Sequence, residues 1–410
     1  MAKRIMVQGT TSYAGKSFLV MVLCRIFRDK GYRVAPFKSQ NTSLNSYVTP
    51  DGKELARAQA LQAFAAGIEP SVEMNPILIK PKGDSRAQLI VNGRPVKDLE
   101  ARNYYKEFVL QEGIQVIQEA YKRLEEEYDL IVIEGAGSPA EINLYEQDIA
   151  NMRVADITDS PVLLVADIDR GGVFASIYGT VKLLKPQHQA RIKGIVINKF
   201  RGDVGILEPG IKMIEDLVGK PVLGILPYIK ELQLPDEDSM ALDGFSIKEK
   251  TGPEVAVIRL PRISNFTDLD PFVYDGVRVR YVESPGELGN PGAIVIPGTK
   301  NTVDDLRWLQ GNGLGGEIKA LAGKIPIVGL CGGFQILGKR IYDEKNLEGS
   351  GTVEGLGLLD VETRFEAYQK VTQRVRGKVM AKGGIFQGAE GGEIYGYEIH
   401  MGRSTLGEGT

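Results

Sequence analysis

The chain has 410 residues, of which 43% are hydrophobic and 25% charged, and its formal net charge is −3. That length predicts two domains with ordinary cores, and the nearly balanced charge gives no electrostatic reason to expect a nucleic-acid surface. Cys24 and Cys331 form no disulfide framework, and neither a membrane-spanning stretch nor an export signal is evident, so we expect a protein of the reducing cytoplasm.

Short apolar runs alternate with longer amphipathic stretches over the first 230 residues. The runs lie at 4–8, 32–37, 129–137, 161–169, 194–200 and 221–227. They lack polar alternation, which indicates strands covered on both faces. Between them, apolar residues recur at helical spacing from Phe18 to Phe27 and from Tyr105 to Leu124. The pattern predicts a doubly wound α/β domain built on a parallel sheet.

A polar, charged stretch at 230–254, interrupted by proline and glycine, indicates a linker between two domains. Further apolar runs follow at 254–261, 277–284 and 292–302. We therefore expect a first domain at 1–235, a linker at 236–252 and a second α/β domain at 253–410.

A glycine-rich segment, VQGTTSYAGKSF, follows the first strand and opens the first helix. Its Gly15-Lys16-Ser17 core predicts a P-loop, in which backbone N–H groups bind phosphate, the lysine reaches the β and γ oxygens, and the serine hydroxyl holds Mg²⁺. The spacing departs from the usual motif, because Gly9 comes one residue too early and Thr10 takes the first position. The residues expected to contact ATP are Thr10, Thr11, Ser12, Ala14, Gly15, Lys16, Ser17 and Asn198.

An acid ends the apolar run at 129–137, at the strand end where doubly wound sheets bind ligands. This residue, Glu134, is predicted to be the second metal ligand beside Ser17. The alternative is a solvated carboxylate with no ligand. Asn198 ends another run and is placed to contact a nucleotide base, although asparagine is also common in such turns.

The stretch GLCGG at 329–333 joins an apolar strand to an apolar helix, as a nucleophile elbow does. Small residues permit the strained turn, the N–H of Gly332 is expected to face an oxyanion, and the helix N-terminus is expected to lower the pKa of the Cys331 thiol. Gly298, in a Pro-Gly turn after the preceding run, is the candidate second oxyanion donor. The alternative is a buried, inert cysteine, which normally has bulky apolar neighbours.

Only His188 and His400 are available as a base for the thiol. His188 lies in a polar connection of the first domain and is predicted to be a surface-loop residue. His400 ends a strand-like run of the second domain, so spacing alone keeps it as a candidate.

A nucleotide-binding domain joined to a domain with a cysteine elbow predicts one reaction that uses both sites. ATP converts a carboxylate into an acyl phosphate, the cysteine releases ammonia from an amide, and the ammonia attacks the activated acyl group. Two rival classes share part of the pattern: a P-loop switch or partitioning ATPase needs no cysteine elbow, and a cysteine hydrolase needs no ATP domain.

Several segments, in order along nearly the whole chain, resemble the cobyric acid synthase family, the glutamine-hydrolysing amidotransferases of cobalamin biosynthesis. They include GTTSYAGKS (9–17), APFKSQNTSLNS (35–46), IEGAGSPAEINL (133–144), DIDRGGVFASIYGT (167–180), RLPRISNFTDLDPF (259–272), GLCGGFQILG (329–338) and GYEIHMG (396–402). The first domain is similar to dethiobiotin synthetase, and the second to the flavodoxin-like domain of class I glutamine amidotransferases.

The resemblance implies amidation of the b, d, e and g carboxylates of adenosylcobyrinic acid a,c-diamide, giving adenosylcobyric acid. Glutamine and ATP·Mg²⁺ are consumed at each step, and no tightly bound redox cofactor, nucleic acid or membrane is involved; a homo-oligomer is compatible with it. Cys331 matches the nucleophile, Lys16 and Ser17 the P-loop pair, and Glu134 the acid near the metal. The residues expected to face the corrinoid carboxylate are Lys38, Gln40, Asn41, Asn45, Asp167 and Arg170, with loop hydrogen bonding as the alternative.

In this family the glutaminase base lies in a later segment of the form G-T-Y-x-H-G, which this sequence lacks. We therefore expect a second domain without its C-terminal end, favour neither histidine as the base, and keep His400 as the fallback. Such a chain is expected to use glutamine poorly and free ammonia better. A sister amidotransferase, acting on the a and c carboxylates or on a cell-wall lipid carboxylate, is the remaining alternative.

Overall fold

The computed structural model describes residues 2–83, 86–100, 108, 112–229, 252–349, 351–381 and 383–407. The chain forms two compact units. The first consists of Met1–Thr42, Leu55–Ile79 and Leu89–Leu234, and the second of Ser43–Glu54, Lys80–Gln88 and Pro235–Thr410. Two short segments inside the predicted first domain therefore count with the second unit, while nearly all of the predicted linker at 236–252 lies outside the described residues.

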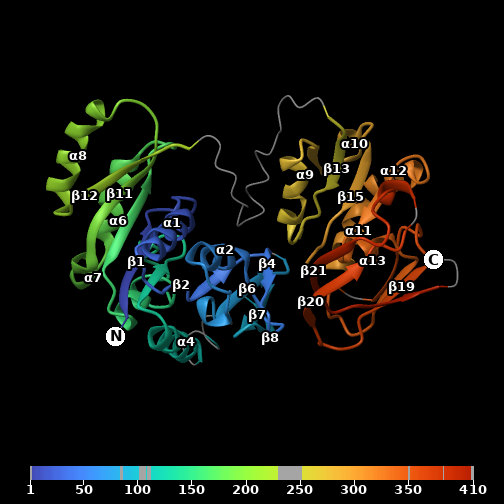
Figure 1. Ribbon diagram of the computed structural model, residues 1–410, viewed down its shortest axis with the longest axis horizontal. Coiled ribbons are helices and arrows are strands. Elements are labelled where there is room, and N and C mark those ends of the chain that lie inside the picture. Colours follow the sequence, from blue (N-terminus) through green and yellow to red (C-terminus); the bar gives the residue numbers. More distant parts are fainter. Residues whose placement is uncertain are drawn as a thin grey trace. The chain divides into compact units, whose positions relative to one another are not determined.

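A six-stranded sheet, in the order β12-β11-β10-β1-β9-β2, forms the centre of the first unit, and every pairing in it is parallel (Figure 1). Its strands are β1 (Lys3–Gly9), β2 (Val34–Phe37), β9 (Leu130–Glu134), β10 (Val162–Asp167), β11 (Ile192–Phe200) and β12 (Val222–Pro227). All six apolar runs of the first domain therefore form strands, and the predicted parallel α/β fold is confirmed.

Both faces of this sheet are buried, because successive side chains of a strand enter different cores. In β9, Ile131 and Ile133 pack into one apolar cluster, whereas Val132 packs into another on the opposite face. Helices α4 and α6 supply the first cluster, and α1 supplies the second. The uninterrupted apolar character of the strands follows from this two-sided burial.

The helices of the first unit are α1 (Lys16–Asp29), α2 (Arg57–Ala66), α4 (Ile114–Glu127), α5 (Met152–Ile157), α6 (Val173–Leu183), α7 (Pro186–Arg191) and α8 (Val204–Val218), with a 3₁₀ turn at Val72–Met74. Helix α1 ends where predicted, and Gly31 after it takes φ 87°. The second predicted helix agrees with α4 at its C-terminal half, but Tyr105 and Val109 lie outside the described residues.

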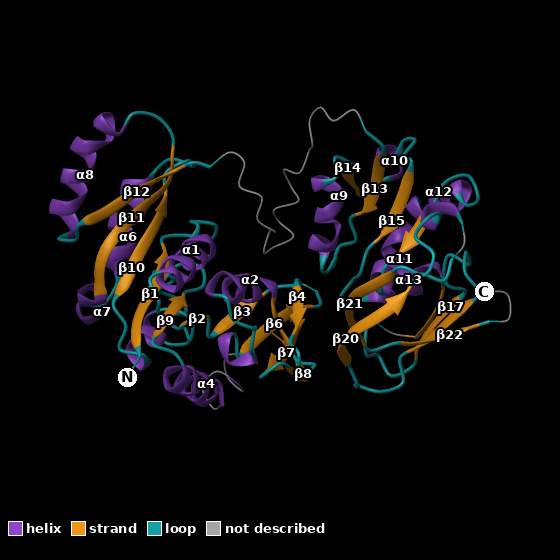
Figure 2. Cartoon of the chain, viewed as in Figure 1, coloured by secondary structure: helices purple, strands orange, loops and turns teal. Residues whose placement is uncertain are grey.

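A smaller sheet, which the sequence did not predict, has the order β3-β6-β7-β8 (Figure 2). Its strands are β3 (Gln40–Thr42), β6 (Ile77–Pro81), β7 (Arg86–Val91) and β8 (Arg94–Glu100), and β4 (Ser46–Val48) pairs with β5 (Glu54–Ala56) in a two-stranded sheet. The ends of β6 and β7 carry Lys80 and Gln88 into the second unit.

The second unit has a parallel sheet with the order β14-β13-β15-β16, which is the flavodoxin-like arrangement 2-1-3-4. Its elements are β13 (Glu254–Ile258), α9 (Asp270–Tyr274), β14 (Arg278–Val282), α10 (Pro285–Leu288), β15 (Ala293–Ile296), α11 (Thr302–Gly311), α12 (Leu314–Leu321), β16 (Ile327–Gly329) and α13 (Gly332–Leu337), with a 3₁₀ turn at Phe266–Leu269. The predicted fold of this domain is confirmed too.

Two mixed or antiparallel layers complete the second unit. One sheet has the order β18-β17-β19-β22, and β20 pairs with β21 in a hairpin. Their bounds are β17 (Arg340–Asp343), β18 (Gly351–Glu354), β19 (Val361–Arg364), β20 (Val371–Lys378), β21 (Glu393–His400) and β22 (Arg403–Leu406), with a 3₁₀ turn at Gly384–Phe386.

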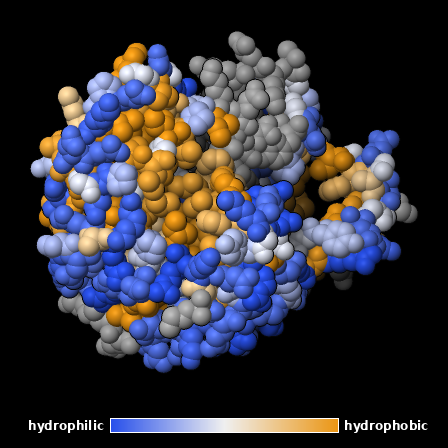
Figure 3. All heavy atoms as spheres, turned by 60° about the vertical axis from the view of Figure 1, so that its left-hand side comes forward, coloured by the Kyte–Doolittle hydropathy of each residue, from blue (hydrophilic) through white to orange (hydrophobic). Residues whose placement is uncertain are grey.

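Apolar side chains gather on the face of the molecule that Figure 3 presents. Exposed large apolar residues of α8 and β12 include Ile206, Met213, Leu217 and Leu223, and they belong to neither core of the first unit. Within the described ranges, no helix combines the length and the apolar character needed to cross a membrane.

Candidate functional site

The glycine-rich loop after β1 is folded as its sequence predicts. Gly15 caps α1 with φ 100°, and a Cβ atom placed there would lie 2.1 Å from Nδ2 of Asn198. That amide nitrogen donates to the carbonyl oxygen of Ala14 at 2.9 Å. Asn198 thus fixes the loop backbone from the end of β11, and the resulting crowding leaves room only for glycine.

The side chain of Lys16 is buried and folds back across the loop. Its Nζ donates to the carbonyl oxygens of Thr11, at 3.0 Å, and Gly137, at 2.9 Å. Both acceptors are backbone carbonyl oxygens, and these contacts place the ammonium group beside the loop. This is the placement that a phosphate-binding lysine requires.

Glu134, at the end of β9, is the polar centre of the first unit. Its buried carboxylate accepts from Ser17 Oγ and Lys38 Nζ, both at 2.8 Å, and from Gln62 Nε2 at 2.5 Å. Gln59 Nε2 lies 3.5 Å away. The structure thus brings together the two predicted metal ligands, Ser17 and Glu134, and their oxygen atoms are the ligand type that Mg²⁺ prefers.

Two of the predicted corrinoid-facing residues lie around this carboxylate. Lys38 pairs with it directly, and Asn41 donates to Gln59 Oε1 at 3.0 Å. Gln40 lies beside Asn41 on β3, whereas Asn45 belongs to the second unit. The structure therefore does not assemble the four residues into one cluster within a single unit.

Asp167 and Arg170 flank the P-loop from the end of β10. Asp167 accepts from Lys199 Nζ at 2.7 Å, and Lys199 also donates to the carbonyl oxygen of Tyr13 at 2.9 Å. The guanidinium carbon of Arg170 lies 5.8 Å from the centre of the Tyr13 ring. Both predicted residues thus contact the loop or its partners, so they are connected to the nucleotide-binding segment.

Cys331 stands on a strained turn between β16 and α13. Its φ is 50° and its ψ −109°, a backbone conformation that residues other than glycine rarely adopt. A Cβ atom at Gly333 would lie 1.9 Å from the carbonyl oxygen of Ile296, and one at Gly329 would lie 2.6 Å from the amide nitrogen of Phe334. Both contacts are with backbone atoms that cannot move aside. The glycines on either side of the cysteine are therefore required by close packing.

The two predicted oxyanion donors lie next to Cys331. Gly332 follows it in the chain, and a Cβ atom at Gly298 would lie 3.7 Å from the cysteine Cβ. Thr299 crowds Gly332 as well, with its Cγ2 only 2.8 Å from the position of a Cβ there. The end of β15 thus approaches the elbow closely enough to form one side of an oxyanion site.

The predicted lowering of the pKa of Cys331 is wrong for the isolated chain. Desolvation by the surrounding protein raises the pKa of the thiol, and this outweighs the hydrogen bond from the Gly332 backbone that lowers it. Glu348 raises the pKa further, whereas Lys80 and Lys370 lower it. The residue is nevertheless exposed, so it is not the buried cysteine of the alternative, and its reactivity stays a prediction.

The thiol of Cys331 donates to the carbonyl oxygen of Ile399 at 3.6 Å. The neighbouring His400 has its Nδ1 2.8 Å from the carbonyl oxygen of Gly402. The sulfur and the imidazole of His400 thus each contact a different carbonyl group, and whether His400 acts as the base stays a prediction.

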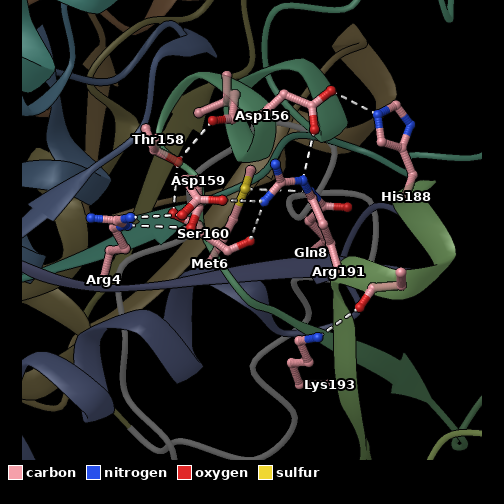
Figure 4. Close-up of polar contacts among 12 residues, drawn as sticks. Arg4, Met6, Gln8, Asp156, Thr158, Asp159, Ser160, His188, Arg191 and Lys193 are labelled. Atoms are coloured by element: carbon pink, nitrogen blue, oxygen red, sulfur yellow. Dashed lines mark hydrogen bonds and ion pairs between the residues drawn. The ribbon is translucent and has the colours of Figure 1, made fainter.

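His188 is not the surface-loop residue that the sequence suggested. It lies in α7 and is buried, with Nε2 2.8 Å from Asp156 (Figure 4). Its Nδ1 lies against the hydroxyl of Tyr145. Arg191 donates to the other oxygen of Asp156 at 2.6 Å. These contacts make His188 a structural residue of the first unit, and they explain its burial.

Sequence inspection missed the buried polar residues that support both sites. Gln59 and Gln62 lie one turn apart on α2 and both face Glu134. The sequence signal that could have revealed them is a pair of glutamines three residues apart in an alanine-rich helix, which places both on one helix face. In the second unit, Glu54, Lys80 and Lys370 form a buried charge cluster whose members lie too far apart in sequence to suggest a contact.

Comparisons with known proteins cover nearly the whole chain. Residues 5–241 match the CobQ/CobB/MinD/ParA nucleotide binding domain, and residues 254–410 match the CobB/CobQ-like glutamine amidotransferase domain.

Individual relatives agree with these two matches. The chain is 54% identical over 409 residues to a probable cobyric acid synthase of Methanothermobacter thermautotrophicus, covering 99% of this chain and 81% of that protein. It is 52% identical over 413 residues to the cobyric acid synthase of Pelotomaculum thermopropionicum, covering 100% of this chain and 78% of that protein. It is 53% identical over 409 residues to the cobyric acid synthase of Dehalococcoides mccartyi strain 195, covering 99% of this chain and 80% of that protein.

Replacing Gly15 with alanine tests the crowding in the P-loop. Both its positive φ and the 2.1 Å approach of Asn198 oppose a Cβ atom, so we expect Gly15→Ala to weaken ATP binding by at least about tenfold. Gly31→Ala is the matched control, because Gly31 also has a positive φ but nothing within 4 Å. It should cost about 1 kcal/mol of stability and leave ATP affinity unchanged. Titration calorimetry with ATP and Mg²⁺ measures both; equal affinities for the two variants would contradict the argument.

Proposed function

This chain belongs to the cobyric acid synthase family, glutamine-dependent amidoligases of cobalamin biosynthesis, and we propose that it converts adenosylcobyrinic acid a,c-diamide into adenosylcobyric acid. The proposed reaction amidates the b, d, e and g carboxylates in turn. The observation that carries the proposal is an identity above one half along nearly the whole chain. Both candidate sites lie within the matched stretch, so the relatives' activity can be assigned to particular residues.

In the first unit, a corrinoid carboxylate oxygen attacks the γ-phosphorus of ATP, ADP leaves, and an acyl phosphate forms. Lys16 carries the positive charge that stabilises the transferred phosphoryl group, and the loop from Thr11 to Gly15 supplies N–H donors. The N–H of Thr10 already donates to the carbonyl oxygen of Val165 at 2.9 Å. Phosphoryl transfer requires mainly positioning and charge neutralisation. A rigid loop fixed by Asn198 supports the positioning, and the buried lysine supports the neutralisation.

Ser17 and Glu134 are the residues that would hold Mg²⁺ in this unit. Their oxygens are 2.8 Å apart, and oxygen is the ligand type that Mg²⁺ prefers. Mg²⁺ supplies charge neutralisation to phosphate oxygens when it is bound. Lys38 offsets the charge of Glu134 and so reduces its repulsion of an incoming carboxylate.

In the second unit, the sulfur of Cys331 attacks the side-chain amide of glutamine. The carbon–nitrogen bond then breaks, ammonia leaves, and a glutamyl thioester remains, which water hydrolyses to glutamate. Gly332 and Gly298 are the proposed donors to the oxyanion. The ammonia attacks the acyl phosphate carbonyl carbon, phosphate leaves, and the amide forms.

Mass spectrometry of the corrinoid product tests the proposed substrate. With adenosylcobyrinic a,c-diamide, ATP, Mg²⁺ and a nitrogen source, we expect a series of products ending at four amidations. Each amidation replaces one carboxyl OH by NH₂, and one ATP should be hydrolysed for each. A product that stops after two amidations of a fully acidic corrinoid, with no reaction of the diamide, would favour the sister activity on the a and c carboxylates.

Replacing Cys331 with alanine separates the two half-reactions. The variant lacks the sulfur nucleophile, so glutamine-dependent amidation should fall at least about 100-fold, whereas amidation from ammonium chloride should stay within about twofold of the unmodified chain. Cys24→Ala is the control, since this buried cysteine in α1 belongs to the core of the first unit. Glutamine-dependent activity that survives in Cys331→Ala would contradict the assigned nucleophile.

The role of His400 can be tested in the same assay. Because the thiol contacts Ile399 and the His400 ring contacts Gly402, we expect His400→Ala to change the ratio of glutamine to ammonia use by less than about threefold. A loss of glutamine use comparable with that of Cys331→Ala, with ammonia use retained, would instead identify His400 as the base.

A further inference from the structure

Two consecutive residues near the end of β11 hold two consecutive carbonyl groups of the P-loop. Asn198 Nδ2 donates to the carbonyl oxygen of Ala14 at 2.9 Å. Lys199 Nζ donates to the carbonyl oxygen of Tyr13, also at 2.9 Å. The P-loop follows β1, and β10 separates β1 from β11 in the sheet (Figure 2). Lys199 therefore reaches the loop across the end of the intervening strand.

Lys199 reaches the loop because its backbone departs from the strand conformation. Successive side chains of an extended strand point to opposite faces of the sheet, so Asn198 and Lys199 would ordinarily diverge. Lys199 instead has φ 59°, in the left-handed region, and the register of β11 with β12 shifts between Ile197 and Phe200. A local irregularity of this kind turns a side chain to a new direction. The left-handed conformation is unfavourable for lysine and persists only where contacts hold it.

Asp167 supplies one of the contacts that hold Lys199. It lies at the end of β10, opposite Asn198 in the strand register, and its carboxylate accepts from Lys199 Nζ at 2.7 Å. The Asp167 side chain is 5% exposed and the Lys199 side chain 30% exposed, so this ion pair is largely shielded from water. The carboxylate thus fixes the position of the ammonium group, and another N–H of that group is directed at the Tyr13 carbonyl oxygen.

Holding a carbonyl group also fixes the N–H group of the same peptide unit. In a trans peptide unit, the C=O of one residue and the N–H of the next lie in one plane and point in opposite directions. Lys199 therefore sets the direction of the Ala14 N–H. In the same way, Asn198 sets the direction of the Gly15 N–H. Tyr13 has φ 59° and Gly15 φ 100°, and successive N–H groups around left-handed residues form the concave anion site of a P-loop.

We propose that Lys199 is a positioning residue for the phosphate site of the first unit. By holding the Tyr13 carbonyl group, it keeps the Ala14 N–H directed at a bound phosphate oxygen. The ammonium group stays bonded to Asp167 and to the loop, so Lys199 acts through the loop backbone and no covalent bond changes. The proposal rests on the proposed function, in which this loop binds ATP, and it adds a residue that the P-loop motif does not include.

Binding of ATP and of inorganic tripolyphosphate, both as Mg²⁺ complexes, tests the proposal by titration calorimetry on the full chain. Tripolyphosphate has the three phosphate groups of ATP without its base or ribose. In Lys199→Met the side chain can no longer donate a hydrogen bond, so we expect the Kd of both ligands to rise about tenfold. Lys199→Arg keeps the charge and the donors, and its Kd values should stay within about threefold of those of the unmodified chain.

Asp167→Ala separates positioning from simple charge attraction. If Lys199 acted only through its positive charge, removal of the neighbouring negative charge would strengthen the binding of tripolyphosphate. If Lys199 acts by holding the loop, loss of the carboxylate that fixes its ammonium group should instead raise the Kd, by about threefold or more. The two explanations therefore predict opposite signs for the same variant.

Two further variants guard against damage to the fold. In Lys199→Asn the new residue tolerates a left-handed backbone but is too short to reach the Tyr13 carbonyl group, so it should bind both ligands as weakly as Lys199→Met. Lys193→Met is the matched control, because Lys193 is an exposed lysine near the start of the same strand. It should leave both Kd values unchanged.

Unchanged tripolyphosphate binding in Lys199→Met, or tighter binding in Asp167→Ala, would overturn the proposal. Weaker binding of ATP alone would also overturn it, because Lys199 would then act on the base or the ribose. If the unmodified chain binds both ligands and the Lys199 variants bind them equally well, only the role of Lys199 is wrong. If the unmodified chain binds neither ligand, the proposed ATP site fails, and this proposal fails with it.

Discussion

The first unit depends on one buried carboxylate. Glu134 has almost no contact with solvent, so its charge must be balanced and its oxygens must be hydrogen-bonded inside the protein. Ser17 from α1, Lys38 from the end of β2 and Gln62 from α2 meet this demand. The same contacts fix the start of α1, and with it the P-loop, against the end of β9. The need to balance and hydrogen-bond the Glu134 carboxylate thus determines where α1, the end of β2 and α2 meet.

In the second unit the main constraint is steric. Gly329 and Gly333 pack so closely against backbone atoms that no side chain fits at either position. This packing holds Cys331 in a backbone conformation that a flexible turn would not keep. The cysteine therefore stands exposed at the end of the sheet, after the exposed Leu330 and before the buried Gly332 and Gly333. Charge balance in the first unit and steric exclusion in the second achieve the same end, a reactive group in a fixed place.

Much of the fold follows from the sequence, because strands buried on both faces must be apolar throughout. The runs around Ile131 and Val165 are recognisable for that reason. The small sheet of β3, β6, β7 and β8 is half exposed and mixes polar with apolar residues, so its strands give no such signal. The P-loop and the cysteine elbow were predicted because each requires glycine at particular positions.

The surroundings of these motifs were not predictable in the same way. The pKa of Cys331 depends on how much protein surrounds the thiol, which no local pattern records, and the helix N-terminus alone suggested the wrong direction. His188 was assigned to the surface because its partners, Tyr145 and Asp156, are distant in sequence. A lysine such as Lys80 is ordinarily assigned to solvent, and only a carboxylate from another strand makes its burial possible.

The interleaving of the two units along the chain limits how this protein can be divided. A cut in the segment between residues 230 and 251 would yield a C-terminal fragment that keeps Lys370 but lacks Glu54, Ser46 and Lys80. That fragment would lose Glu54 and Gln88, the partners of the Lys370 ammonium group, and it would lose β4 as a neighbour of β20. Gene fission between residues 230 and 251 is therefore a poor evolutionary route to separate subunits, and an amidotransferase half produced on its own would need residues 43–54 and 80–88 supplied in trans or grafted onto it.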